Sequence, residues 1–174
     1  MAYNISKTLA YSEVEISSPL GVAQMNLPAE NLVVGTILRA GLPMHQGFLN
    51  YFDRAECAFV SAYRKYDKSG EFDVQVEYLS APDLTDKTLI LVDPMIATGA
   101  SMVLTYKALI AKGIPRHIHI VAAIGSQQGL SYVKQKLPTK TSIWVAAIDK
   151  ELTARAYIVP GLGDAGDLAF GKKD

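Results

Sequence analysis

A continuous apolar run from Thr88 to Val92 ends in Asp93, and a loop of small residues then leads into a helix pattern that begins at Ser101. Apolar runs without alternation are typical of parallel strands covered on both faces. Parallel strands need a crossover between them, which is usually a helix. This feature therefore favours an α/β sheet in which ligands bind beyond the carboxyl ends of the strands.

The rest of the chain alternates strand and helix patterns, which predicts a mostly parallel central sheet flanked by helices. Further strand patterns cover 31–38, 55–63, 117–124 and 142–148, and helix patterns cover 3–11, 42–52, 101–112 and 126–136. Residues 14–17 and 22–27 predict paired strands, and 55–78, with a turn signal at 67–70, predict a hairpin or arm. Because the sequence shows no linker and no internal repeat, we predict that residues 1–174 form a single domain.

The composition excludes several classes of protein. Among 174 residues, 17 basic side chains balance 17 acidic ones, whereas a general nucleic-acid or membrane surface needs a basic excess. The single cysteine, Cys57, cannot form an internal disulfide, and the sequence shows neither a signal-peptide core nor an apolar run of membrane-spanning length. We therefore expect a cytoplasmic protein without nucleic-acid or membrane partners.

The loop after Asp93 has the properties of a phosphate site, because a helix that begins there presents unpaired N–H groups and the positive end of its dipole. Gly99 permits close approach of the backbone, and Thr98 and Ser101 supply hydroxyl donors. Asp93 would repel a phosphate but can accept hydrogen bonds from sugar hydroxyls, so a sugar phosphate fits best. The alternative is a plain strand–turn–helix connection with an N-cap at Ser101.

Two arginines are candidates for holding phosphate oxygens, because a guanidinium group binds two oxygens at once. Arg39 follows a buried strand at the sheet edge where ligands gather. Arg64 lies beside Lys65 on the predicted hairpin and is also compatible with an exposed surface charge. A functional role is favoured for both.

Other patterns are better explained by packing. His117 and His119 share a strand face but lack a third ligand at suitable spacing, so we interpret them as packed or edge histidines rather than a metal pair. His45 and Trp144 are interpreted as structural, and Cys57 as a buried small hydrophobe.

Two nucleotide motifs are not supported. Gly161, Gly163 and Gly166 fit the dinucleotide pattern, which also needs an acidic residue about 20 positions on, yet eight residues follow Gly166. These glycines better suit a loop whose backbone contacts the edge of a flat base. The segment 99–101 lacks the lysine of a P-loop.

Four segments resemble the uracil phosphoribosyltransferase family, over about residues 4–173. Asp93-Pro-Met-Ile-Ala-Thr-Gly-Ala-Ser101 resembles its phosphoribosyl pyrophosphate loop, in which an acid and a proline replace the acidic pair of other phosphoribosyltransferases. Ile37–Gly41 looks like its pyrophosphate-side loop, and Ala62-Tyr63-Arg64 like its second arginine position. Tyr157–Asp167, followed by Phe170-Gly171, is similar to its uracil-binding tail.

The resemblance implies a type I phosphoribosyltransferase fold with a β-arm and a small hood from the C-terminal tail. It implies transfer of phosphoribose from phosphoribosyl pyrophosphate to uracil, with Mg²⁺ held mainly by substrate oxygens. The implied donor-binding residues are Arg39, Arg64, Asp93, Pro94, Met95, Ile96, Ala97, Thr98, Gly99, Ala100, Ser101 and Asp164. The implied uracil contacts are Ile158, Gly163, Asp164 and Ala165, and the implied catalytic residues are Asp93 and Asp164.

The resemblance further implies a homodimer or higher homo-oligomer and GTP as an effector, although the sequence gives no independent sign of a GTP site. Relatives usually carry a leading segment before the region matching Ile5–Thr8, whereas Met1 stands almost immediately upstream here. Ala100 stands where glycine is common, and the arm 65–77 differs in length and charge from many relatives.

Three alternatives stay open from the sequence. A non-catalytic nucleotide-sensing or RNA-binding regulator of this fold would need a basic face, which the even charge balance does not indicate. A shortened, inactive copy would bind ligand without turnover. A phosphoribosyltransferase for another base is the third, although purine enzymes of this fold usually carry two adjacent acids where this chain has Asp93-Pro94.

Overall fold

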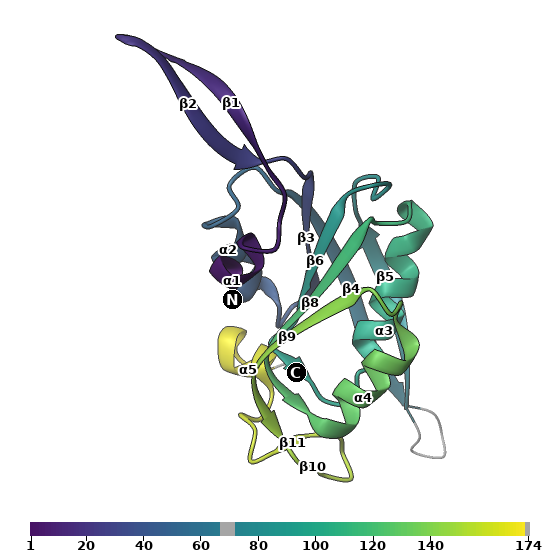
Figure 1. Cartoon of the computed structure of the whole chain (residues 1–174). Helices are drawn as coiled ribbons and strands as arrows, with labels where there is room; N and C mark the ends of the chain where they lie inside the picture. The colour runs from purple at the N-terminus through teal and green to yellow at the C-terminus, as the bar shows by residue number, and fades with distance from the viewer. Residues whose placement is uncertain (67–71, 173–174) are drawn as a thin grey trace.

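The computed structural model describes the backbone of residues 1–66 and 72–172, with side chains throughout these ranges except 62–66 and 72–75. A central seven-stranded sheet has the order β5-β4-β3-β6-β8-β7, with β9 paired to β8 (Figure 1). Its strands are β3 (Leu32–Leu38), β4 (Glu56–Tyr66), β5 (Phe72–Ser80), β6 (Thr88–Val92), β7 (Met95–Ile96), β8 (His117–Ser126) and β9 (Thr141–Asp149). Among these, β4 and β5 pair antiparallel and the other neighbours pair parallel, which confirms the predicted sheet.

Helices cover both faces of the sheet and bury two apolar cores (Figure 1). The helices α3 (Ala100–Leu109) and α4 (Gln127–Lys136) cover one face, and α1 (Ala2–Ser6) and α2 (Leu42–Leu49) cover the other. Because successive strand residues point to opposite faces, Leu89 joins the first core and Ile90 the second. All five residues of β6 are buried, which explains its continuous apolar run.

The observed helices differ from the predicted ones at their ends. The helix predicted over 3–11 ends at Ser6, because Ala10 instead donates its N–H to the Glu30 carboxylate over 2.9 Å and leads into a strand. The helix α3 begins one residue before its predicted start, and its predicted last turn is the 3₁₀ helix η1 (Ile110–Lys112). No helix in the described part of the chain combines the length and apolarity needed to cross a membrane.

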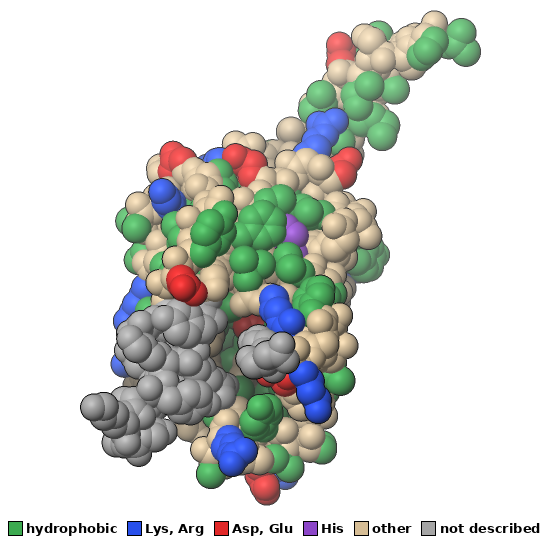
Figure 2. Space-filling model, turned by 180° about the vertical axis from the view of Figure 1, so that it is seen from behind, with side chains coloured by type: hydrophobic (Ala, Val, Ile, Leu, Met, Phe, Trp, Pro, Cys, Tyr) green, Lys and Arg blue, Asp and Glu red, His purple; other side chains and the backbone are tan. Residues whose placement is uncertain are grey.

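An antiparallel pair of strands, β1 (Tyr11–Ser18) and β2 (Gly21–Pro28), projects from the body of the molecule (Figures 1 and 2). We call this pair the β1–β2 arm. The sequence predicted its strands but assigned the arm-like character to 55–78. That segment forms the antiparallel pair β4–β5 at the edge of the central sheet, and its predicted turn at 67–70 lies outside the described residues.

The C-terminal tail folds beside the carboxyl ends of the central strands (Figure 1). It contains the short paired strands β10 (Glu151–Leu152) and β11 (Ile158–Val159) and the helix α5 (Ala165–Phe170). This is the position expected of a hood.

Candidate active site

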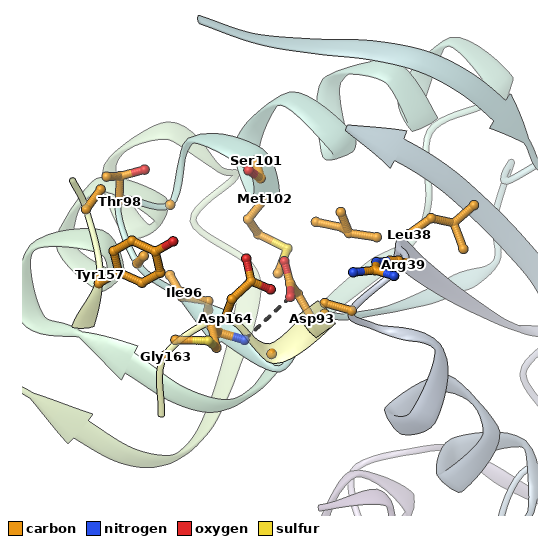
Figure 3. Close-up of a pocket in the computed structure, with 18 residues that line it drawn as sticks. Leu38, Arg39, Asp93, Ile96, Thr98, Ser101, Met102, Tyr157, Gly163 and Asp164 are labelled. Atoms are coloured by element: carbon orange, nitrogen blue, oxygen red, sulfur yellow. Dashed lines mark hydrogen bonds between the residues drawn. The ribbon is translucent and has the colours of Figure 1, made fainter. Parts of the chain in front are cut away.

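A cavity of about 520 Å³ opens at the carboxyl ends of β3 and β6 (Figure 3). Three segments far apart in the sequence line it: 37–40 at the end of β3, part of 93–102 after β6, and part of 156–166 in the tail. Figure 3 shows Asp93, Met102 and Asp164 turned toward its interior. The loop and the tail that the sequence paired therefore meet in one cavity.

The loop between β7 and α3 presents the start of a helix to this cavity. Gly99 is the N-cap of α3 with φ 80°, a left-handed conformation that favours glycine. The N-cap therefore lies two residues before Ser101, the N-cap that the alternative of a plain strand–turn–helix connection predicted. Thr98 Oγ1 accepts a hydrogen bond from the Ala100 N–H over 3.3 Å, and the Ser101 side chain lines the cavity.

Asp93 lies at the inner end of the cavity, directly after the buried strand β6. Burial raises the pKa of its carboxyl to about 7, and a hydrogen bond from the Met95 N–H, 3.4 Å long, opposes this rise only in part. A carboxyl with this pKa changes its charge near neutral pH, which is common among groups that act on ligands.

Arg39 connects the cavity wall to the tail. Its Nη2 donates to Asp167 Oδ1 and to the Gly171 carbonyl, each over 2.7 Å, and its guanidinium carbon lies 5.9 Å from the centre of the Phe170 ring. Its Nε is buried and donates to no group in the described part of the chain. One edge of the guanidinium is therefore occupied by the tail, while Arg39 also lines the cavity.

The tail presents a short, glycine-rich backbone. Asp164 is the N-cap of α5, and its Oδ1 accepts a hydrogen bond from the Asp167 N–H over 3.0 Å. The strand before the glycines, β11, has two residues and lies outside the central sheet. This context does not match a dinucleotide fold, in which a sheet strand feeds directly into the phosphate-binding helix.

Most of the predicted site residues line the cavity. They are Arg39, Asp93, Met95, Ile96, Ala97, Thr98, Gly99, Ser101, Gly163, Asp164 and Ala165. Three others do not reach its wall. The Pro94 carbonyl accepts hydrogen bonds from the N–H groups of Ala123 and Ile124, Ala100 is already inside α3, and Ile158 is 3% exposed within β11. The side chain of Arg64 lies outside the described part of the chain.

The cavity also contains residues that the sequence did not single out. Met102 follows the predicted loop by one position in the first turn of α3, and Ala156 directly precedes the quoted tail motif. Gly166, one of the glycines that the sequence assigned to a base-contacting loop, also lines the cavity, although it was not named among the uracil contacts. Only the adjacency of Met102 to the predicted loop could have pointed to it, and no local pattern marks Ala156. Asp167, the partner of Arg39, was part of the quoted tail motif but received no role.

The histidines have packing roles. His119 is buried and accepts a hydrogen bond from Trp144 Nε1 over 3.0 Å at its Nδ1, and burial with the nearby His117 lowers its pKa to about 4. His45 packs against the Phe59 ring, with ring centres 4.9 Å apart. Cys57 is a free thiol and only half-buried, not fully buried as predicted, because it points to the face of β4 opposite that of the fully buried Ala58 and Val60.

Comparisons with known proteins agree with this geometry. The family model described as uracil phosphoribosyltransferase matches residues 1–172. A uracil phosphoribosyltransferase from Porphyromonas gingivalis is 56% identical over 173 residues, covering 99% of this chain and 80% of that protein. One from Thermococcus gammatolerans is 37% identical over 174 residues, covering 98% of this chain and 76% of that protein.

Solved structures agree as well. A protein from Aquifex aeolicus superposes with a TM-score of 0.87 at 29% identity, covering 98% of this chain and 80% of that one. A hypoxanthine phosphoribosyltransferase from Staphylococcus aureus, 13% identical with a TM-score of 0.52 over 76% of this chain and 73% of that one, shares the fold alone. A match over nearly the whole length, together with a loop and a tail that meet in one cavity, shows that the chain belongs to the uracil phosphoribosyltransferase family.

Proposed function

We propose that residues 1–174 act as one phosphoribosyltransferase domain that makes UMP and pyrophosphate from uracil and phosphoribosyl pyrophosphate. The observation that carries this proposal is the shared cavity of the Thr98 loop and the Gly163–Gly166 tail. One wall suits a ribose 5-phosphate and the other suits a flat base, and both substrates of this reaction must meet at one carbon atom.

The donor would occupy the sheet side of the cavity. The backbone and hydroxyls of Ala97 to Ser101 would hold the 5′-phosphate at the positive end of α3. Asp93 would accept hydrogen bonds from the ribose hydroxyls, and Arg39 would meet the pyrophosphate. Arg64 keeps its sequence-based assignment to the donor.

Uracil would lie against the tail. The backbone of Gly163 and Ala165 borders the cavity, and backbone amides and carbonyls can match the alternating donors and acceptors of a pyrimidine edge. Asp164 stands between this edge and the donor side. Ile158 would act indirectly, because its buried side chain anchors β11 beneath the glycines.

The chemistry is a displacement at the anomeric carbon of the ribose. The bond from this carbon to a pyrophosphate oxygen breaks, a bond to uracil N1 forms, and the N1 proton leaves to solvent or to the departing pyrophosphate. The ribose gains positive charge during this exchange, so the Asp93 and Asp164 carboxylates would stabilise it electrostatically. Holding both substrates in register supplies the rest of the rate.

Mg²⁺ is the cofactor that this proposal includes. Asp93 and Asp164 offer carboxylate oxygens, the ligand type that Mg²⁺ prefers. The described residues contain no group of three potential metal ligands, so the site fits an ion that takes its other ligands from substrate oxygens and water. When bound, the ion would neutralise charge on the departing pyrophosphate.

We extend the proposal to a homo-oligomer in which a second copy of the chain covers the β1–β2 arm. In the register of this arm, Val14, Ile16, Ala23 and Met25 share one face, and Glu13, Glu15, Gln24 and Asn26 share the other. Every residue of the arm except the half-buried Leu27 is solvent-exposed, yet an isolated two-stranded ribbon is marginal in water. An apolar face on such a ribbon favours a partner.

Two further assignments complete the proposal. The free thiol of Cys57 suits a reducing compartment, which supports the cytoplasm as its location. GTP is the effector implied by the family resemblance, and a rate measured with and without GTP tests it directly.

The decisive experiment is an incubation of the purified protein with phosphoribosyl pyrophosphate, Mg²⁺ and each nucleobase in turn. We expect UMP from uracil and no nucleotide from adenine, guanine or hypoxanthine. A purine nucleotide would support the enzyme for another base. Binding of donor and uracil without any product would support the inactive copy, and RNA binding without turnover would support the regulator.

A further inference from the structure

The start of α4 holds the loop of the proposed phosphate site in place. Ser126 is fully buried, ends β8 and is the N-cap of α4. Its Oγ accepts a hydrogen bond from the Gly129 N–H over 2.8 Å and donates to the Ala97 carbonyl. One hydroxyl group thus joins the first turn of α4 to a loop residue that lines the cavity.

Glycine at two positions lets the loop lie directly against α4. A Cβ atom added at Gly129 would lie 2.2 Å from the Ala97 carbonyl oxygen. One added at Gly99 would lie 2.8 Å from the Gly129 carbonyl oxygen. Neither glycine can take a side chain without moving the backbone, so contact between the two backbones sets the position of the loop.

The contact with Ser126 also fixes the direction of one backbone donor. The peptide bond between Ala97 and Thr98 is trans, and in a planar trans unit the carbonyl and the following N–H point in opposite directions. Because the Ala97 carbonyl points toward Ser126, the Thr98 N–H points away from Ser126, and Thr98 itself lines the cavity. In the described part of the chain, neither this N–H nor that of Gly99 has a protein acceptor.

We propose that Ser126 is a positioning residue that aims the Thr98 N–H at the phosphate of the ribose 5-phosphate group. This inference rests on the proposed function, which supplies the phosphate. Ser126 would not touch the ligand. It would act by holding the donor in its binding direction before the ligand arrives, so that the loop needs no rearrangement when the anion binds.

The test compares two ligands that differ in the phosphate alone, UMP and uridine, by titration calorimetry. Ser126→Ala and Ser126→Gly both remove the hydroxyl, and glycine is nearly as good an N-cap as serine, so the second variant keeps α4 stable. Ser131→Ala is the matched control, because Ser131 is exposed on the same helix and its hydroxyl bonds to the Gln127 carbonyl instead. Circular dichroism melts confirm that each variant folds.

We expect both Ser126 variants to weaken the binding of UMP by about tenfold, while the binding of uridine stays unchanged. A loss of about tenfold is the scale of one hydrogen bond to a charged group. The KM for phosphoribosyl pyrophosphate should rise in parallel and the KM for uracil should not. Ser131→Ala should match the wild type with both ligands.

Two results would overturn the inference. One is an equal loss of UMP and uridine affinity, which indicates a general structural role. The other is unchanged UMP affinity in a folded Ser126 variant. If the wild-type protein itself showed no preference for UMP over uridine, the phosphate site of the proposed function would be wrong, and the inference would fall with it.

Discussion

The guanidinium of Arg39 donates to the carboxylate of Asp167 over 2.7 Å, which ties the loop after β3 to the helix α5 of the tail. These residues lie 128 positions apart in the sequence. The contact joins the proposed donor side of the cavity to the proposed uracil side. Because the two side chains are 30% and 33% exposed, solvent screens the pair, and we expect it to contribute about 0.5–1 kcal/mol.

The first prediction is that Asp167→Ala increases local opening of α5 without lowering the global free energy of unfolding by more than this amount. Amide hydrogen exchange at 165–170 should accelerate by roughly two- to fivefold, the factor equivalent to the lost ion pair. Leu168→Ala is the control, because Leu168 is an exposed neighbour on the same helix. Equal exchange rates in Asp167→Ala and the wild type would contradict a stabilising role of the Arg39–Asp167 ion pair.

The second prediction concerns Arg39 as a ligand of the donor. Arg39→Ala should lower kcat/KM for phosphoribosyl pyrophosphate by a factor equivalent to about 2–4 kcal/mol of transition-state stabilisation. This is the cost of removing one partner of a charge pair. Steady-state kinetics with the donor varied at saturating uracil measure this. Arg54→Ala, which removes an exposed arginine away from the cavity, should change nothing. Normal donor kinetics in Arg39→Ala would remove this residue from the site.

The sequence could predict the part of the site that a single local pattern specifies. The buried run 88–92 has both faces covered, so it stays apolar throughout and identifies a central strand. The loop after it needs small residues because Gly99 lies against Gly129. Periodicity alone could not place the tail at this loop. That expectation came from the family resemblance, and the cavity agrees with it.

The parts that escaped prediction depend on packing between distant segments. No pattern links Ser126 to Ala97 or Arg39 to Asp167, because these contacts appear only after β8 and the tail have docked. A contiguous motif also overstates the cavity wall. Within one loop, some residues border the cavity and others contact the sheet. The Pro94 carbonyl, for example, accepts hydrogen bonds from β8. The roles of the individual site residues stay predictions.

The third prediction separates folding from turnover at Asp164. Asparagine is as good an N-cap as aspartate, so Asp164→Asn should retain the hydrogen bond from the Asp167 N–H and melt close to the wild type. Turnover should nevertheless fall, because the negative charge beside the reacting carbon is lost. Melting curves and kcat are compared with Asp53→Asn, the same change at an exposed site. Equal losses of melting temperature and activity would favour a structural role.

The fourth prediction tests the apolar face of the β1–β2 arm. Val14→Asp places a charge on that face and should weaken self-association by roughly 3 kcal/mol, because the charge would have to be buried without a partner. Ser17→Asp places the same side chain on the opposite face, where it is paired with Val22 and not with a carboxylate, and should leave association unchanged. Light scattering over a concentration series measures both. A wild-type protein that is monomeric at every concentration would rule out the proposed assembly.

The fifth prediction follows from the raised pKa of Asp93. The pKa of this carboxyl is about 7 in the folded protein and 3.8, its ordinary value, in the unfolded chain. The carboxyl therefore favours folding most at a pH where it is protonated in both the folded and the unfolded state. This contribution is complete below about pH 3.8 and is lost as the pH rises toward 7 and beyond. At about 1.4 kcal/mol per pKa unit, the rise from 3.8 to about 7 corresponds to a total loss of roughly 4–5 kcal/mol above pH 7. Asp93→Asn removes the titration.

The measurement is urea unfolding of the wild type and Asp93→Asn from pH 4 to pH 8.5. The variant should gain stability over the wild type progressively through this range, because the wild type must hold a charged carboxylate in the cavity at high pH. Asp53→Asn, the same change at an exposed site, is the control. A stability difference between the wild type and Asp93→Asn that is constant with pH would mean that Asp93 titrates normally. Its role would then have to be explained without an unusual carboxyl.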